Sequence, residues 1–141
     1  MTDAREDALR GLTGGIPYLQ FLGMRFERSG DELTAVLPFT PHLIGNPVIP
    51  ALHGGVTAAF LEVTAIVGLV WAGLGEGVQV SALPKTIDLT VDYLRAGQPK
   101  DSFARARINR SGRRYASVQV EAWQDDPSRL FAQGNGHFLM P

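Results

Sequence analysis

The sequence contains no cysteine among its 141 residues. This absence excludes disulfide bonds, thiolate metal sites and cysteine nucleophiles. Charged residues are also sparse, at 19% of the chain with a formal net charge of -1. The sequence therefore gives no electrostatic reason to expect nucleic acid or an anionic membrane as a partner. A few well-placed arginines can still bind an anionic small molecule. We expect neither a metal ion nor a cofactor.

The chain has one long apolar segment, residues 51–75, which is nearly long enough to span a bilayer. Glu62 and several glycines interrupt it, and no Lys or Arg flanks it closely. We interpret the segment as a buried helix within a soluble domain. Residues 1–7 are polar and mixed in charge, unlike a signal peptide, so we expect a cytoplasmic protein.

The length and the hydrophobic content of 45% fit one folded domain over residues 1–141. Residues 1–15 predict an N-terminal helix and turn, and the helix begins at Asp3 and ends at Leu12. A second helix, from Gly54 to Ala72, is hydrophobic nearly all round. Residues 38–50 contain four prolines and predict a loop. Alternating apolar residues predict strands over 21–28, 33–37, 86–93, 103–108, 115–122 and 130–140.

A single all-round hydrophobic helix beside a strongly alternating sheet indicates an α+β fold in which an antiparallel sheet wraps around the helix. Other α+β layouts need a second long helix to cover the sheet, and the sequence predicts none. One face of the sheet must still be covered. A dimer that joins two sheets edge to edge would do this.

Glu62 is the first candidate for chemistry, because it is the only Asp, Glu, Lys or Arg between Leu33 and Gly75. Burying an unpaired carboxylate costs several kcal/mol, so its presence in the most apolar helix suggests a function. That function would be as a general base or a nucleophile. The alternatives are an exposed residue on a polar stripe with Thr57 and Thr64, or an ion pair at a dimer interface.

The run His53-Gly54-Gly55 is the second candidate, because it lies where the loop enters the long helix. Bare backbone N–H groups and the helix dipole favour negative charge at such a point, so they can polarise a carbonyl and stabilise an oxyanion. The alternative is that the glycines only permit a sharp turn. His53 is either a base or a packed residue that caps the turn, and the residues favour the cap.

The spacing of these two candidates has a consequence for the assembly. Gly54 and Glu62 are eight residues apart, which is roughly 12 Å along a helix. One site cannot easily use both groups from the same helix. Two antiparallel helices across a dimer could bring Glu62 of one chain to Gly54 of the other, so catalysis by this pair requires a dimer.

Three features together resemble the phenylacetate-degradation (PaaI-like) branch of the hotdog-fold acyl-CoA thioesterases. They are Asn46, the run from Leu52 to Val56 that contains His-Gly-Gly, and Glu62 nine residues after the histidine. The stretch from Thr86 to Arg95 resembles the strand that follows the helix in this family. The resemblance covers about residues 17–140. It implies a hotdog fold, an acyl-CoA substrate, and a homodimer that pairs into a dimer of dimers.

The resemblance also implies roles for single residues. The N–H of Gly54 would polarise the thioester carbonyl, and Asn46 would help to hold the substrate or water. Glu62 of the partner subunit would activate water or attack the carbonyl, assisted by Thr86. The remaining substrate-binding candidates are His53, Gly55, Arg95, Arg113 and Arg114.

The arginines would meet the phosphates of CoA, although a solvated charged turn is an equally good interpretation of each. Asn46 stands seven residues before His53, one more than in the family, so its position is open. The acid is Glu where the family branch often has Asp, which leaves direct attack and attack through water both open.

Two other functions remain as alternatives. The segment from His42 to Pro50 looks like the active-site loop of hotdog hydroxyacyl-thioester dehydratases, whose catalytic His is followed fourteen residues later by a carboxylate. Here that position is Val56, so the dehydratase pair is broken. A non-catalytic hotdog protein that binds acyl-CoA is the second alternative, because a fold does not fix a function.

Overall fold

The computed structural model describes residues 3–79 and 81–141; residues 1 and 2, which begin the predicted N-terminal segment, lie outside this part. The chain opens with helices α1 (Ala4–Gly14) and α2 (Pro17–Leu22) and the hairpin β1 (Arg25–Ser29) and β2 (Glu32–Leu37). A short 3-10 turn and a small hairpin then lead into the long helix; these are η1 (Pro41–Leu43), β3 (Ile44–Asn46), β4 (Ala51–Leu52) and α3 (Gly54–Gly75). Four further strands complete the chain: β5 (Lys85–Tyr93), β6 (Ser102–Ser111), β7 (Tyr115–Trp123) and β8 (Leu130–Leu139).

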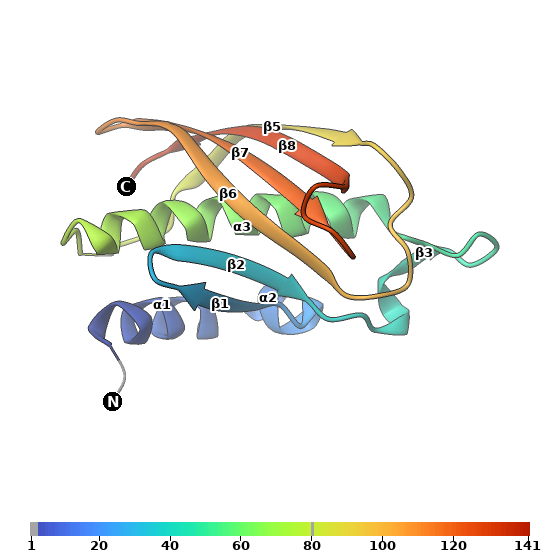
Figure 1. Cartoon of the computed structure of the whole chain (residues 1–141). Helices are drawn as coiled ribbons and strands as arrows, with labels where there is room; N and C mark the ends of the chain where they lie inside the picture. Colours follow the sequence, from blue (N-terminus) through green and yellow to red (C-terminus); the bar gives the residue numbers. More distant parts are fainter. Residues whose placement is uncertain (1–2, 80) are drawn as a thin grey trace.

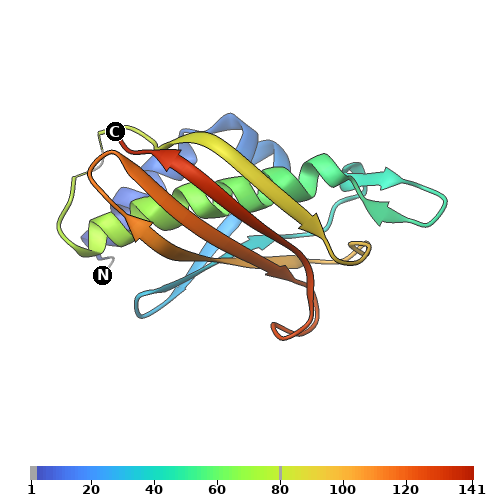
Figure 2. The same cartoon turned by 90° about the horizontal axis from the view of Figure 1, so that it is seen from above.

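One antiparallel sheet wraps around α3 (Figure 1 and Figure 2). Its six strands run in the order β1-β2-β6-β7-β8-β5, so β1 and β5 are the two edges. Alternation decides which side chains face the helix. In β7 the alternate residues Ala116, Val118, Val120 and Ala122 are all buried. The predicted fold class, an antiparallel sheet around one long helix in the hotdog arrangement, is confirmed.

Helix α3 supplies much of the core. Phe60, Leu61, Ala65 and Leu69 pack in one cluster with buried residues of the sheet such as Phe138. By length and composition alone α3 could cross a membrane, but 56% of its most apolar window is buried inside the fold. This burial is typical of the core helix of a globular domain, because the sheet covers the apolar surface of the helix.

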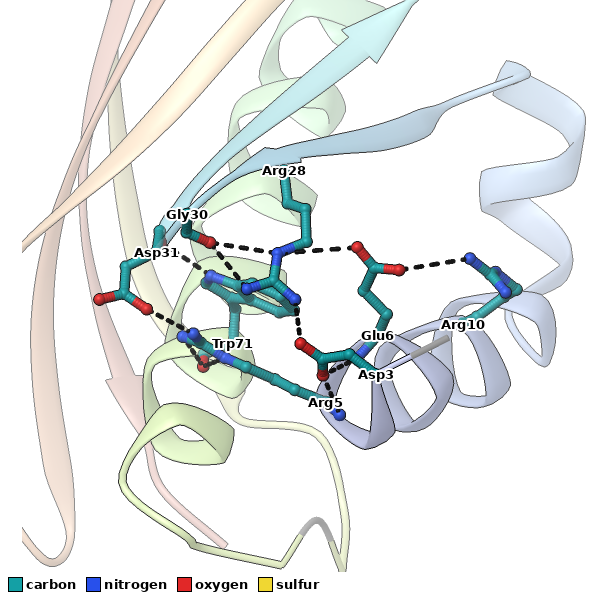
Figure 3. A network of polar contacts seen from close by, with 8 residues as sticks. All are labelled: Asp3, Arg5, Glu6, Arg10, Arg28, Gly30, Asp31 and Trp71. Carbon is teal, nitrogen blue, oxygen red and sulfur yellow. Dashed lines mark hydrogen bonds and ion pairs between the residues drawn. The ribbon is translucent and has the colours of Figure 1, made fainter. Parts of the chain in front are cut away.

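The N-terminal helix α1 is fixed to the second half of α3. Leu9 packs with Val67 and Trp71 in a small separate cluster. The guanidinium groups of Arg5 and Arg28 lie over the indole of Trp71, with their central carbons 3.7 and 4.8 Å from the ring centre. Figure 3 shows the hydrogen bonds and ion pairs that further join α1, strand β1 with the turn after it, and α3. They position α1 as a cover on the side of α3 that the sheet leaves open.

The strand predicted to begin at Phe21 is wrong in its first residues, which belong to α2. Pro17 occupies the start of this helix, where its missing N–H costs nothing. Gly23 ends the helix in the left-handed region, at φ 76°. The chain becomes extended only at Arg25. The alternation of apolar residues around Met24 therefore extended the predicted strand across a helix end.

The predicted loop over residues 38–50 also contains more structure than expected. It holds η1, and β3 pairs with β4, so that Ile44 lies opposite Leu52 and Asn46 opposite Ala51. In Figure 1 the tip of this hairpin projects beyond the sheet. The prolines at its tip limit the pairing to a few residues, because proline cannot donate to a strand ladder.

Candidate active site

The amino end of α3 presents a backbone N–H that no acceptor in the described part of the chain uses. His53 is the N-cap: its Nδ1 accepts from the N–H of Gly55 at 2.9 Å, and its carbonyl accepts from the N–H of Thr57 at 3.1 Å. No acceptor in residues 3–79 or 81–141 bonds to the N–H of Gly54. A free N–H at a helix start carries partial positive charge and can receive an oxygen ligand.

The two glycines of this turn meet different demands. A Cβ on Gly55 would lie 2.9 Å from Nδ1 and Cε1 of His53, so the capping ring occupies that space. A Cβ on Gly54 would meet no atom closer than the Tyr93 hydroxyl, at 3.5 Å, which is an ordinary contact. Neither glycine has a positive φ. The chain's own fold therefore requires glycine at 55 but not at 54, where the bare Cα leaves room for an approaching group.

Neighbouring segments fix the entry into α3. The N–H of His53 donates to the carbonyl of Leu43, and the N–H of Leu52 donates to the carbonyl of Gly97, each at 2.9 Å. A Cβ on Gly45 would lie 2.6 Å from the Cα of His53, so the hairpin packs directly against the cap. The helix start is thus held between η1 and the loop after β5.

Asn46 lies in the projecting hairpin and serves its own turn. Its Oδ1 accepts from the N–H of Val48 at 3.0 Å, an Asx-type turn. Its amide nitrogen donates to no group in the part of the chain that the structure describes. The structure therefore does not bring Asn46 into hydrogen-bonding contact with Gly54.

Glu62 is half-buried on α3. Its carboxylate forms no hydrogen bond or ion pair with any residue in the ranges 3–79 and 81–141. The alternative of a polar stripe is wrong, because Thr57 and Thr64 are buried at 3% and 4% exposure. Thr64 instead donates to the carbonyl of Phe60 at 2.6 Å. The half-buried neighbours of Glu62 at helical spacing are apolar: Ala58, Ala59 and Ile66.

Thr86 lies beside a bulge in β5. It pairs with Phe138, whereas Asp88 pairs with His137, so Ile87 is the extra residue. Because paired residues share a face and Phe138 is fully buried, Thr86 points to the helix side of the sheet. No hydrogen bond joins Thr86 to Glu62 among the described residues.

The predicted arginines fall into two places. Arg95 follows the end of β5, and its Nε donates to the carbonyl of Leu130 at 3.0 Å. Arg113 and Arg114 lie in the turn between β6 and β7, at the other end of the sheet. Along β8 the two ends are marked by Ala132 and Leu139, a distance of roughly 23 Å at 3.3 Å per residue. The structure does not bring the two sets together within one chain.

Arg113 and Arg114 border a depression of about 560 Å³, which is also lined by Arg110, Tyr115, Ser117 and His137. Within the described ranges none of these three arginines has an acidic partner. The arginines that do form ion pairs are Arg5, Arg10, Arg25, Arg28, Arg105 and Arg107. His137 contacts Asp88 at 2.7 Å. This corner is therefore basic and has an exposed aromatic ring, which suits a phosphorylated ligand.

His42 has no free ring nitrogen. Its Nδ1 contacts the hydroxyl of Thr40 at 3.0 Å and its Nε2 contacts the carbonyl of Phe21 at 3.1 Å. With Val56 at the position of the dehydratase carboxylate, the ring is built into the loop rather than offered to a substrate. In residues 3–79 and 81–141 no group of three or more His, Asp or Glu side chains is placed to hold a metal ion.

Comparison with known proteins decides the family. Residues 50–130, which include the helix start and Glu62, match the family model described as "Thioesterase superfamily". The chain belongs to the thioesterase superfamily. A curated relative, "Medium/long-chain acyl-CoA thioesterase YigI" of Escherichia coli, is 36% identical over 123 residues, covering 79% of this chain and 77% of that protein.

Two solved structures agree with the fold. A protein from Chromobacterium violaceum is 34% identical, with a TM-score of 0.73 over 97% of this chain and 93% of that one. A phenylacetic acid degradation-related protein from Ralstonia eutropha is 23% identical, with a TM-score of 0.77 over 98% of this chain and 100% of that one, and supports the fold alone. The predicted membership of a hotdog thioesterase family is confirmed.

Tyr93 is the residue at this site that sequence reasoning missed. Its hydroxyl donates to the carbonyl of Gly54 at 2.7 Å. The sequence pattern identifies Tyr93 only as one residue of an alternating strand. Its contact with Gly54 joins the end of β5 to the start of α3, two segments that are far apart in the sequence. No local signal predicts it.

Proposed function

We propose that the protein hydrolyses acyl-CoA thioesters to a free acid and CoA. In this proposal the N–H of Gly54 polarises the thioester carbonyl and stabilises the oxyanion that forms on it. Glu62 of the partner subunit acts as a general base on water or as the nucleophile. The observation that carries the proposal is the N–H of Gly54, which has no acceptor among residues 3–79 and 81–141 and belongs to a residue without a side chain.

The use of Glu62 from a second subunit follows from the length of α3. Eight residues separate Gly54 and Glu62, so within one chain they lie roughly 12 Å apart. If two copies of α3 cross antiparallel near Ala58 and Ala59, each Glu62 reaches the other copy's helix start. Both alanines are half-buried, and their small side chains would let the helices approach closely.

The edge strand β5 offers the second half of such a dimer interface. It is nine residues long, contains no proline and has one unpaired side. Ile87 and Tyr93 on it are exposed by 53% and 55%. A long edge strand with one unpaired side tends to pair with another chain. Pairing of two β5 strands would make a continuous sheet, and dimers of this kind would pair further into a dimer of dimers.

The remaining residues have supporting roles in the proposal. Thr86 would assist Glu62 or the attacking water, and Asn46 would reach the substrate through its free amide nitrogen. Arg95, Arg113 and Arg114 would contact the phosphates of CoA. Because Arg113 and Arg114 lie far from their own Gly54, they would serve the substrate of another subunit. The acyl-CoA class is supported by the name of the Escherichia coli relative, and we expect the protein to act in the cytoplasm.

Measurement of thiol release from short, medium, long and aromatic acyl-CoA esters tests the proposal. The wild-type protein should release CoA from at least one class. Glu62→Ala should lower kcat by at least about 100-fold while the oligomeric state, measured by light scattering, stays unchanged. Glu76→Ala, at the far end of the same helix, is the matched control and should keep full activity. Hydrolysis by Glu62→Ala at the parent rate would refute the mechanism, and binding without turnover by the wild type would leave only a binding protein.

A further inference from the structure

The peptide bond between Gly54 and Gly55 is held from both of its polar ends. Its N–H, on Gly55, donates to Nδ1 of His53 at 2.9 Å. Its carbonyl, on Gly54, accepts from the hydroxyl of Tyr93 at 2.7 Å. Two adjacent glycines have the most backbone freedom to lose, so an unrestrained pair would sample many orientations. The two side chains, together with the backbone of α3, which begins at Gly54, hold this peptide in one orientation.

From this geometry we infer that Tyr93 is a positioning residue for the Gly54 N–H. The inference rests on the proposed function, in which that N–H binds the thioester carbonyl. Donors aimed at an oxyanion stabilise it best when no reorganisation is needed during the reaction. Tyr93 provides this by fixing the residue that carries the donor, while its ring lies in ordinary contact range of the position that a Cβ on Gly54 would take.

The position of Tyr93 links two parts of the proposed dimer. It is the last residue of β5, the edge strand, and Gly54 is the first residue of α3. The hydrogen bond from this hydroxyl therefore connects β5, which we expect at the dimer interface, to the start of α3, which we expect at the active site. Formation of the dimer interface would restrict the motion of β5 and, through Tyr93, the motion of the Gly54 N–H.

The variant Tyr93→Phe tests the inference, because it keeps the ring and removes only the hydroxyl. We expect kcat to fall about 10-fold, a part of the roughly 100-fold or larger loss caused by removing an oxyanion donor. KM, the melting temperature and the oligomeric state should stay unchanged, which separates positioning from a general structural role. Tyr18→Phe is the matched control: Tyr18 is 49% exposed on α2, outside the proposed site, and the variant should show parent kinetics.

A second measurement does not depend on activity. In Tyr93→Phe the amide hydrogen of Gly55 should exchange with solvent several-fold faster than in the parent, because the peptide loses its hydrogen bond from the Tyr93 hydroxyl. Unchanged kcat, or a change confined to KM, would overturn the inference, as would unchanged exchange at Gly55. Failure of the wild-type protein to hydrolyse any acyl-CoA would instead refute the proposed function, and the exchange result would still decide whether Tyr93 restrains the peptide.

Discussion

The ring of His53 fills the space that a side chain on Gly55 would need. Its Nδ1 and Cε1 both lie 2.9 Å from the position of such a Cβ, and the same Nδ1 accepts the N–H of Gly55. Glycine is therefore required at residue 55, because a side chain there would displace the capping ring of His53. Residue 54 has no such neighbour, which separates a structural glycine from one that suits a ligand.

Alanine substitutions should divide these two roles. Gly55→Ala should lower the free energy of unfolding by about 1–3 kcal/mol, because the methyl group displaces the capping ring. Gly54→Ala should leave stability unchanged or raise it by up to about 1 kcal/mol, since alanine favours a helix. It should nonetheless lower kcat/KM at least about 10-fold by obstructing the oxyanion donor. Urea denaturation and thiol-release kinetics measure the two effects.

The ion pair of Asp3 with Arg28 should make the docking of α1 depend on pH. The hydrogen bond from Arg28, with further bonds from the N–H groups of Arg5 and Glu6, lowers the pKa of Asp3 below its ordinary value of 3.8. A carboxyl group whose pKa is lower in the folded state adds stability above its unfolded pKa. That contribution disappears as the pH falls through the lowered pKa.

Asp3→Asn isolates this contribution, because Asn still caps the helix but carries no charge. At pH 6 the variant should melt at a lower temperature than the parent, and the difference should shrink as the pH is lowered below 3.8. Thermal melts followed by circular dichroism measure it. A difference in melting temperature that is independent of pH would show that the charge of Asp3 does not contribute.

The fold could be predicted from the sequence wherever periodicity was long. The apolar run around Glu62 predicted α3, and strict alternation predicted β5 to β8. The failures lie where short-range signals compete: Pro17 and Gly23 bound a helix of six residues whose last two, Phe21 and Leu22, were predicted to open a strand. The β3–β4 hairpin around Asn46 was not predicted, because the prolines within residues 38–50 indicated a loop.

The candidate site could be predicted only in part. The position of Gly54 at a helix start was correct, because glycine pairs and helix ends are local features. Glu62 stood out as a lone charge. Tyr93 could not be found, because its contact with Gly54 depends on how β5 crosses the end of α3. The separation of Arg113 from Arg95 likewise needed the strand pairing.

The basic corner at the turn between β6 and β7 should recognise the nucleotide end of CoA. The double variant Arg113→Ala, Arg114→Ala should raise KM for an acyl-CoA about 10-fold, as expected for the loss of charge-assisted phosphate contacts. It should leave KM unchanged for the matching acyl-pantetheine, which lacks the nucleotide. Arg129→Ala, an arginine in another turn, is the control. Equal effects on both substrates would show that these arginines do not meet the phosphates.

Mixed dimers test whether each active site is shared between subunits. One chain carries Gly54→Val and a differently tagged chain carries Glu62→Gln, so each homodimer has two defective sites. In the mixed dimer one site combines the intact Gly54 of the second chain with the intact Glu62 of the first. The other site carries both substitutions.

If Gly54 and Glu62 act across the interface, the mixed dimer, purified through both tags, should recover about half of the wild-type kcat per dimer, because one of its two sites is restored. If both groups acted within one chain, every site would carry a defect and no activity would return. Size-exclusion chromatography with light scattering confirms that the measured species is a dimer. The roughly 12 Å between the two groups on one helix favours the first outcome.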